Sequence, residues 1–270
     1  KKLQAVEALG QARIIAVDKT GTITKNEMVI QRVCVDGKFF EIGGIGYEPK
    51  GEVQLNGNLI DSVNHPELLF AGKIAAFCAS ARVMFSEEEK VWRIAGDPTE
   101  AAMLVFAEKL GFHKDDLERE SPLVGEIPFD YKLKYHATVH RLDGQKFLAI
   151  VGAPETVLGL SERIWRGGKS HHLSNQEKQD LESVFLSMSQ EGLRVVALAE
   201  SREISDELKQ EMISNLTFVG FFGMKDALRP EVAGAMRKAA SAGIRVVMIT
   251  GDHKVTAQAI AKEAGIYKEG

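Results

Sequence analysis

The pattern of hydrophobic and polar positions differs between the two ends of the chain and its middle. A short, mostly β-branched apolar run at 13–17 predicts a buried central strand of a parallel sheet. Near the other end, the pattern predicts a helix at 230–242, a strand at 244–250 and a helix at 252–264, the alternation that is typical of parallel α/β sheets. Because the two ends are alike, we interpret them as one doubly wound domain interrupted by an insertion.

The middle of the chain instead predicts an antiparallel sheet with helices. Several of its short alternating runs are separated by Asp-Gly or Asn-Gly dipeptides, which favour tight hairpin turns. The predicted strands lie at 29–35, 39–42, 52–55, 135–142, 145–151, 194–199 and 216–223, and the predicted helices at 67–81, 98–110 and 174–192. Capping boxes are predicted at Asp97 with Glu100 and at Ser174 with Glu177. We therefore expect an α+β insertion.

Composition limits the class of protein without identifying its function. The 270 residues are 44% hydrophobic and 27% charged, which is enough to form a folded core. The formal net charge of −4 gives no reason to predict a nucleic-acid partner. The two cysteines, Cys34 and Cys78, are too few for a disulfide framework and fit a reducing compartment. No apolar stretch approaches the about 20 residues that a membrane-spanning helix needs.

Polar segments follow the apolar strands predicted at the two ends. Asp18 comes directly after the first strand, and Thr250 ends the second. If these strands are neighbours, both residues face the crevice in which open α/β sheets bind ligands. A carboxylate there can attack phosphorus and form an aspartyl-phosphate. The alternatives are that Asp18 forms an Asx turn and that Thr250 or Asp252 only caps a helix.

A longer and more specific string begins at Asp18. Residues 18–24, Asp-Lys-Thr-Gly-Thr-Ile-Thr, closely resemble the phosphorylation motif of P-type cation-transporting ATPases. Four further stretches follow in the order of that family: Gly96-Asp97-Pro98-Thr99-Glu100, Pro128-Phe129-Asp130, Gly152-Ala153-Pro154-Glu155 and Met248-Ile249-Thr250-Gly251-Asp252. The resemblance covers essentially the whole chain and is greatest to the calcium-pump branch.

The resemblance implies a fold, cofactors and a larger protein. Residues 1–28 and 226–270 would form part of a haloacid-dehalogenase-like phosphorylation domain with a parallel sheet, and residues 29–225 an α+β nucleotide-binding domain. The implied cofactors are ATP and Mg²⁺. The implied partners are ATP and the rest of a pump, with its transmembrane helices and actuator domain. This segment would then be the cytoplasmic portion of an integral membrane protein that couples ATP hydrolysis to cation transport.

The resemblance also implies roles for residues in the phosphorylation domain. Asp18 would accept the γ-phosphoryl group, with Lys19 beside it. Asp18 and the carbonyl group of Thr20 would be the Mg²⁺ ligands. The phosphate would be contacted by Thr250, Gly251 and Asp252.

A second set of residues is implied to bind the nucleotide: Glu100, Phe129, Lys134, Gly152 and Arg194, with Asp226 and Arg229 at the border of the insertion. Phe129 would stack on adenine, and Glu100 would accept a hydrogen bond from the adenine amino group. Gly152 would permit a close approach of the base, and Arg194 would contact phosphates. Without the resemblance, simpler explanations hold: Phe129 as a core residue, Glu100 as part of a capping box and Arg194 as a surface charge.

The sequence departs from the family pattern at three places. Val151 stands where the family usually carries lysine, so we expect weak ATP binding that a lysine would tighten. The stretch Asp226-Ala227-Leu228-Arg229 lacks the two prolines usual between its aspartate and arginine, which predicts a less stiff hinge. A later phosphate-binding lysine and a Gly-Asp-Gly-x-Asn-Asp string have no counterpart in these residues. We therefore expect the 270-residue chain to be close to inactive as an ATPase.

Two other functions are compatible with part of the pattern. A soluble haloacid-dehalogenase-like phosphatase usually carries a second aspartate two residues after the nucleophile as general acid–base. Thr20 stands at that position, and because threonine cannot perform this role we expect a persistent phosphoenzyme. A non-catalytic nucleotide-binding module is the other alternative for the isolated chain. Turnover of ATP by the purified chain would indicate an enzyme, whereas ATP binding alone would indicate the non-catalytic module.

Overall fold

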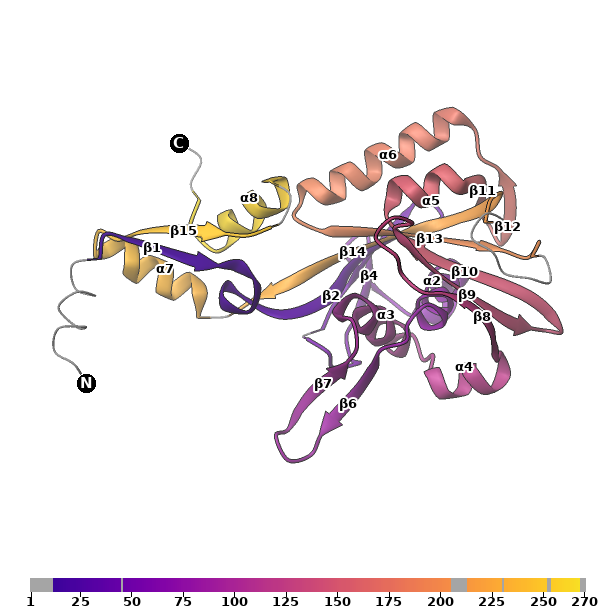
Figure 1. The fold of residues 1–270 in the computed structure, drawn as a ribbon, viewed down its shortest axis with the longest axis horizontal. Helices are drawn as coiled ribbons and strands as arrows, with labels where there is room; N and C mark the ends of the chain where they lie inside the picture. Colours follow the sequence, from indigo (N-terminus) through magenta and orange to yellow (C-terminus); the bar gives the residue numbers. More distant parts are fainter. Residues whose placement is uncertain (1–11, 45, 205–212, 230, 252–253, 268–270) are drawn as a thin grey trace. The chain divides into compact units, whose positions relative to one another are not determined.

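The computed structural model describes residues 12–44, 46–204, 213–229, 231–251 and 254–267 (Figure 1). Their contacts divide the chain into two compact units. The terminal unit comprises the described residues within Lys1–Glu27, Gln190–Gly192 and Asp226–Gly270. The middle unit comprises those within Met28–Ser189 and Leu193–Lys225.

The largest sheet is mainly antiparallel, and most of its residues belong to the middle unit. In spatial order its strands are β5 (Asn58–Ile60), β4 (Val53–Leu55), β3 (Lys38–Ile42), β2 (Thr24–Val35), β14 (Leu216–Leu228), β13 (Arg194–Ser201), β10 (Gln145–Gly152), β9 (Tyr135–Leu142) and β8 (Leu123–Ile127). A further strand, β11 (Ser161–Arg166), pairs in parallel with β14 and antiparallel with β12 (Lys169–His172). The predicted antiparallel α+β architecture is therefore confirmed for this unit.

Three tight turns fix the register of the hairpins in this sheet. They are formed by Asp36-Gly37, Asn56-Gly57 and Asp143-Gly144, and all six residues have φ between 50° and 78°. Two consecutive residues at positive φ are characteristic of type I′ turns, whose twist matches that of paired strands. The turns predicted from these dipeptides are confirmed.

Helices cover both faces of the middle sheet (Figure 1). Along β10, Phe147, Ala149 and Val151 belong to the apolar cluster that includes residues of α2 (Pro66–Phe77) and α3 (Pro98–Lys109). The alternate residues Leu148 and Ile150 belong to the cluster that includes residues of α5 (Pro154–Leu160) and α6 (Asn175–Gln190). A strand with both faces covered is apolar along its length rather than alternating, as this one is.

Smaller elements in this unit have no counterpart among the predictions. A separate hairpin pairs β6 (Arg82–Ser86) with β7 (Val91–Ala95). The remaining helices are η2 (Ser62–Asn64) and α4 (Lys114–Glu120). The helix predicted at 67–81 ends earlier, at Phe77, and Cys78 is its C-cap residue.

The terminal unit contains a parallel pair of strands. The strand β1 (Ile14–Asp18) pairs with β15 (Arg245–Ile249), so that Ile14 lies beside Arg245 and Asp18 beside Ile249. The helices of this unit are α7 (Val232–Ser241) and α8 (Lys254–Glu263). Asp252, where the second helix was predicted to begin, lies outside the described residues.

The prediction that 13–17 is a buried central strand is wrong for this structure. Ile14 is 62% exposed and Ile15 is 38% exposed, while Ile249 on the neighbouring strand is 59% exposed. Among the described residues, β1 pairs with one strand only. A central strand needs neighbours on both edges and cover on both faces, so an apolar run alone does not produce burial.

In the described part of the chain, no helix is both long enough and apolar enough to cross a bilayer.

Candidate functional site

The first candidate site lies at the carboxyl end of β1 in the terminal unit. The strand ends at Asp18, and the turn Lys19–Ile23 that follows includes Gly21 at φ 74°, a conformation that glycine adopts without strain. Asp18 and Thr20 are exposed, whereas Lys19 is buried. Since β1 and β15 run in parallel with Asp18 beside Ile249, Asp18 and Thr250 leave the sheet at the same edge. This is the placement that the sequence predicts, but the chemical roles of these residues stay predictions.

Asp226 binds the beginning of β2 within the terminal unit. Its carboxylate is buried, with Oδ2 accepting a hydrogen bond from Thr24 Oγ1 at 2.5 Å and Oδ1 accepting one from the Glu27 amide at 3.1 Å. The Thr24 hydroxyl also lies 3.0 Å from the Lys19 carbonyl oxygen. The contacts of Asp226 are therefore with the protein backbone and a threonine at the end of the Asp18 turn.

Arg229 holds the same turn from its other side. Its Nη2 donates to the Gly21 carbonyl at 2.9 Å, and its amide donates to the Ile23 carbonyl at 3.0 Å. The resemblance implied that Asp226 and Arg229 bind nucleotide, and that role stays a prediction. Sequence reasoning missed that they also shape the turn after Asp18, because these contacts join residues about 200 positions apart.

The oxygen donors at this turn are suitable for part of a Mg²⁺ site. Asp18 offers an exposed carboxylate and Thr20 a backbone carbonyl, and Mg²⁺ prefers oxygen ligands and keeps several waters. Among the described residues, no group of three or more His, Cys, Asp or Glu side chains could hold a metal ion by itself. The donor set of Asp18 and Thr20 therefore fits a Mg²⁺ site that keeps several waters.

The second candidate site lies at one end of the middle sheet, where a turn carries Phe129 between β8 and β9. Asp130 Oδ1 accepts hydrogen bonds from the amides of Lys132 at 2.7 Å and Leu133 at 3.2 Å, which folds the turn back on itself. Phe129 is 51% exposed and meets the ring of Tyr131 edge to face at 5.4 Å. The alternative that Phe129 is a core residue is therefore wrong.

Strand pairing brings Lys134, Gly152 and Arg194 to this same end of the sheet. Gly152 pairs with Tyr135, so Lys134 lies just beyond the pair. Gly152 also pairs with Ala197 of the antiparallel β13, so the exposed Arg194 lies beyond the end of β10.

Gly152 is also required by its own sheet. A Cβ atom there would lie 2.6 Å from both the Lys134 carbonyl oxygen and the Tyr135 Cβ. Contacts this short do not occur between folded residues, so a larger side chain would force the two strands apart. The close approach that Gly152 allows in this structure is therefore that of β9, and an approach by a nucleotide base stays a prediction.

Glu100 reaches this region from the first turn of α3. Asp97 caps the helix as predicted, with Oδ1 accepting from the amides of Thr99 at 2.7 Å and Glu100 at 3.2 Å. The other half of the predicted capping box is wrong, because the Glu100 carboxylate turns toward Ser80 and Ala81. Its Oε2 accepts from the Ser80 amide at 2.9 Å, the Ser80 hydroxyl at 2.7 Å and the Ala81 amide at 3.1 Å.

His136 is a neighbour of Glu100 that sequence reasoning missed. Its side chain is 7% exposed, Nε2 lies 2.9 Å from Glu126 Oε1, and Nδ1 lies 3.6 Å from Glu100 Oε1. Within the described residues, Nδ1 has no hydrogen-bond partner. No motif signals this histidine; its position opposite Val151 in the β9–β10 register places it there.

Val151, the departure from the family pattern, is buried at 6% exposure in the apolar cluster on the α2 and α3 face of the sheet. A lysine would have to carry its ammonium group into or past this cluster. We therefore predict that a lysine at this position lowers the stability of the unit, instead of tightening ATP binding as the family pattern suggests.

Comparison with known proteins decides the family. A model of the family described as "P-type ATPase, cytoplasmic domain N" matches residues 70–231, more than half of the chain. The chain belongs to the P-type ATPase family. It is 38% identical over 97% of its length to "Calcium-transporting ATPase" of Bacillus subtilis, and 38% identical over its full length to "Cation-transporting ATPase pma1" of Synechocystis. It is 32% identical over its full length to "Calcium-transporting ATPase type 2C member 1" of Bos taurus.

The chain spans 27–30% of the length of these three P-type ATPases. The matched region contains Glu100, Phe129, Lys134, Gly152 and Arg194 of the second candidate site, together with Asp226 and Arg229. Asp18 and Thr250 lie outside it, but within the part of the chain that the full-length relatives cover.

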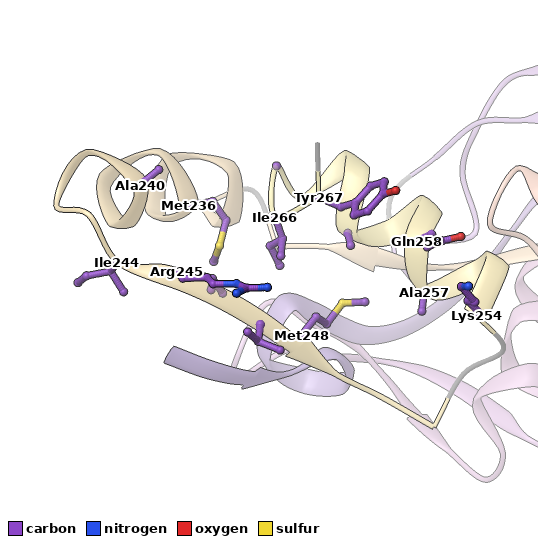
Figure 2. Close-up of a pocket in the computed structure, with 14 residues that line it drawn as sticks. Met236, Ala240, Ile244, Arg245, Met248, Lys254, Ala257, Gln258, Ile266 and Tyr267 are labelled. Carbon is purple, nitrogen blue, oxygen red and sulfur yellow. The ribbon is translucent and has the colours of Figure 1, made fainter. Parts of the chain in front are cut away.

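Two of the cavities lined by described residues of this P-type ATPase chain lie near elements discussed above. One, of about 550 Å³, lies in the terminal unit among α7, β15 and α8 (Figure 2). Met236, Met248 and Ile266 contribute apolar surface to it, and Lys254 and Gln258 contribute polar atoms. Among the described residues that line it, none is predicted to bind phosphate or nucleotide.

The other cavity, of about 170 Å³, lies in the middle unit beside the Glu100 contacts. Ser80, Lys114, His136 and His140 are among its lining residues. Burial lowers the pKa of both Lys114 and His140. Ser80 and His136 line this cavity and also lie next to the Glu100 carboxylate.

Proposed function

We propose that this chain is the ATP-binding and phosphorylation portion of a P-type ATPase that couples ATP hydrolysis, through an aspartyl-phosphate, to the transport of a cation, with calcium as the first candidate. The remainder of the pump, including membrane-spanning helices and an actuator domain, is its proposed partner. The terminal unit is the proposed haloacid-dehalogenase-like part. Family membership supports the proposal, and the grouping of Glu100, Phe129, Lys134 and Arg194 at one end of the middle sheet carries it.

In this proposal the middle unit binds ATP. Phe129 stacks on the adenine ring, because an exposed aromatic ring on a turn is a suitable platform for any base. The free carboxylate oxygen of Glu100 accepts a hydrogen bond from the adenine amino group. Lys134 and Arg194 lie exposed at the same end of the sheet and neutralise phosphate charge.

The terminal unit then accepts the phosphoryl group. An Asp18 carboxylate oxygen attacks the γ-phosphorus, and the bond from that phosphorus to its bridging oxygen breaks, with the electron pair leaving on ADP. Thr250 and the Gly251 amide contact the phosphoryl oxygens. Asp18 and the Thr20 carbonyl would hold Mg²⁺, which supplies positive charge near the reacting oxygens.

The residue two positions after the nucleophile separates this function from that of a phosphatase. Thr20 has no group that can act as general base on an attacking water at neutral pH. The aspartyl-phosphate should therefore persist long enough to be isolated.

The nucleotide-binding part is tested by replacing Phe129. Phe129→Ala should weaken ATP binding by about 1–3 kcal/mol, or about 5- to 150-fold, because the stacking surface is lost. The matched control is Phe39→Ala, which removes a 41% exposed phenylalanine from β3. Calorimetry that gives equal dissociation constants for wild type and Phe129→Ala would contradict the proposed site.

The phosphorylation part is tested separately with γ-³²P-labelled ATP and Mg²⁺. We expect trace, acid-stable and hydroxylamine-sensitive label on the 270-residue chain, and its loss in Asp18→Asn. Label that persists in Asp18→Asn would show that another residue is modified. Stoichiometric label that depends on Asp18 would support the nucleophile and overturn the expectation of near-inactivity.

A further inference from the structure

We infer that Ser80 determines the base selectivity of nucleotide binding by fixing the Glu100 carboxylate, so that one oxygen is held by the protein and the other is offered to the 6-amino group of a purine. Ser80 is thus a positioning residue that acts through Glu100. The inference rests on the proposed function, since it presupposes that Glu100 faces the base.

The two oxygens of Glu100 have different surroundings. Oε2 accepts three hydrogen bonds, from the Ser80 amide, the Ser80 hydroxyl and the Ala81 amide, at 2.7–3.1 Å. Oε1 accepts none from the described residues, and the ring nitrogen nearest to it, His136 Nδ1, is 3.6 Å away. A carboxylate oxygen has more than one lone-pair direction, so Oε1 keeps its full capacity to accept.

These three hydrogen bonds to Oε2 fix the direction in which Oε1 points. A free glutamate side chain samples many rotamers, and fixing it in one of them costs conformational entropy. Because the Ser80–Ala81 segment already fixes the Glu100 side chain in the absence of ligand, this entropy is not lost again on binding. Such preorganisation increases affinity. His136 is the neighbour of Oε1, with Nδ1 at 3.6 Å, and its other ring nitrogen, Nε2, lies 2.9 Å from Glu126 Oε1.

The chemistry of Oε1 selects the ligand. An ionised carboxylate only accepts hydrogen bonds, so it favours an amino group and repels the carbonyl oxygen of a 6-oxopurine. A fixed carboxylate discriminates more strongly than a mobile one, because a mobile one can turn away from the wrong group. Loss of a hydrogen bond to Oε2 is therefore expected to reduce selectivity.

The test compares ATP with purine riboside triphosphate, which carries hydrogen in place of the 6-amino group. The ratio of their dissociation constants is measured by calorimetry for the wild-type chain, Ser80→Ala and Ser80→Thr. Ser80→Ala removes one of the three donors and leaves both amides. We expect the preference for ATP to fall about three- to tenfold in Ser80→Ala and to be restored in Ser80→Thr, which keeps a hydroxyl.

Controls separate positioning from a general structural effect. Ser183→Ala removes an exposed serine whose hydroxyl donates to the Gln179 carbonyl in α6, and should leave the ratio unchanged. In a Glu100→Gln background, Ser80→Ala should change the ratio by less than about twofold if Ser80 acts through Glu100. Independent effects of the two substitutions would overturn the inference.

The outcomes also distinguish this inference from the proposed function. Equal weakening of both triphosphates in Ser80→Ala would overturn the positioning role while leaving nucleotide binding intact. If the wild-type chain bound neither triphosphate, the proposed function would fail and the inference with it. A lower ATP preference in Ser80→Ala that Ser80→Thr restores would support it.

Discussion

The two units of this P-type ATPase chain place their candidate residues in the same way but support them differently. In each, polar residues lie at the end of an apolar strand or just beyond it: Asp18 and Thr250 in the terminal unit, Lys134 and Arg194 in the middle unit. In the middle unit these strands belong to a wide sheet with an apolar cluster on each face. In the terminal unit they form a two-stranded sheet in which Ile14 and Ile249 are exposed.

This difference shows that the position of a site and its rigidity have separate causes. Parallel pairing is enough to bring Asp18 and Thr250 to one edge. Rigidity depends on how much apolar surface the supporting elements bury, and regions with few buried contacts open at lower free energy. We therefore expect the middle unit to be the more stable support.

The largest expected effect comes from the core of the middle sheet. Phe222→Ala should cost about 3–5 kcal/mol, because this fully buried ring also packs edge to face on Phe106 at 5.1 Å. Met248→Ala, at a half-buried position in β15, should cost less than about 2 kcal/mol. Hydrogen exchange of β13 and β15 amides at increasing urea measures both. Equal losses would show that the units do not differ as proposed.

A charge placed in the same core should have the next largest effect. Val151→Lys is expected to lower stability by about 2–4 kcal/mol, since burying an unpaired ammonium group is unfavourable. Val151→Met reaches a similar length without a charge, so it carries only the cost of overpacking, about 1–3 kcal/mol, and should be less destabilising than Val151→Lys. Urea unfolding and ATP calorimetry are measured on both. Tighter ATP binding at unchanged stability would restore the expectation derived from the family pattern.

The cap of α3 links stability with the site. Asp97→Ala should cost about 0.5–2 kcal/mol, because two amides of the first turn lose their acceptor. ATP affinity should fall as well, since Glu100 lies in that turn. Asp97→Asn keeps a good cap and should retain both properties. A stability loss with unchanged ATP affinity would show that the position of Glu100 does not depend on the cap.

The smallest expected effect is a pH dependence where the first turn of α2 meets β3. Burial opposes ionisation of Glu67, but hydrogen bonds from Lys38 at 2.6 Å and His65 at 3.1 Å outweigh it and lower its pKa from 4.5. A lowered pKa contributes stability above pH 4.5 that is lost as the pH falls through the value in the folded state. Acidification should therefore destabilise the wild-type chain at this site.

Lys38→Met tests this contribution. It should cost less than about 1 kcal/mol at pH 7, because Lys38 is partly exposed, and the acid-induced loss should become smaller. Lys90→Met, which breaks the exposed pair with Glu87, is the control. Urea midpoints at pH 7 and pH 4 measure the effect. An identical acid-induced loss in Lys38→Met and wild type would contradict the role of the pair.

The sequence by itself determined features that depend on neighbouring residues. The type I′ turns follow from Asp-Gly and Asn-Gly pairs, and the Asp97 cap joins residues two and three positions apart. The capping box of α6 forms as predicted, with Glu177 Oε2 accepting from the Ser174 amide at 2.8 Å and from its hydroxyl at 2.7 Å. The motif strings also indicated the P-type ATPase family, which the comparisons confirm.

Only the tertiary structure decided features that depend on residues distant in sequence. The apolar runs at 14–17 and 147–151 look alike, yet the first is largely exposed and the second is buried. The second run has strands on both edges and apolar clusters with helix residues on both faces. Glu100 satisfied the local capping pattern but is held by Ser80, 20 residues away. Burial and long-range hydrogen bonds are set by which elements meet in space, and the local sequence does not encode that information.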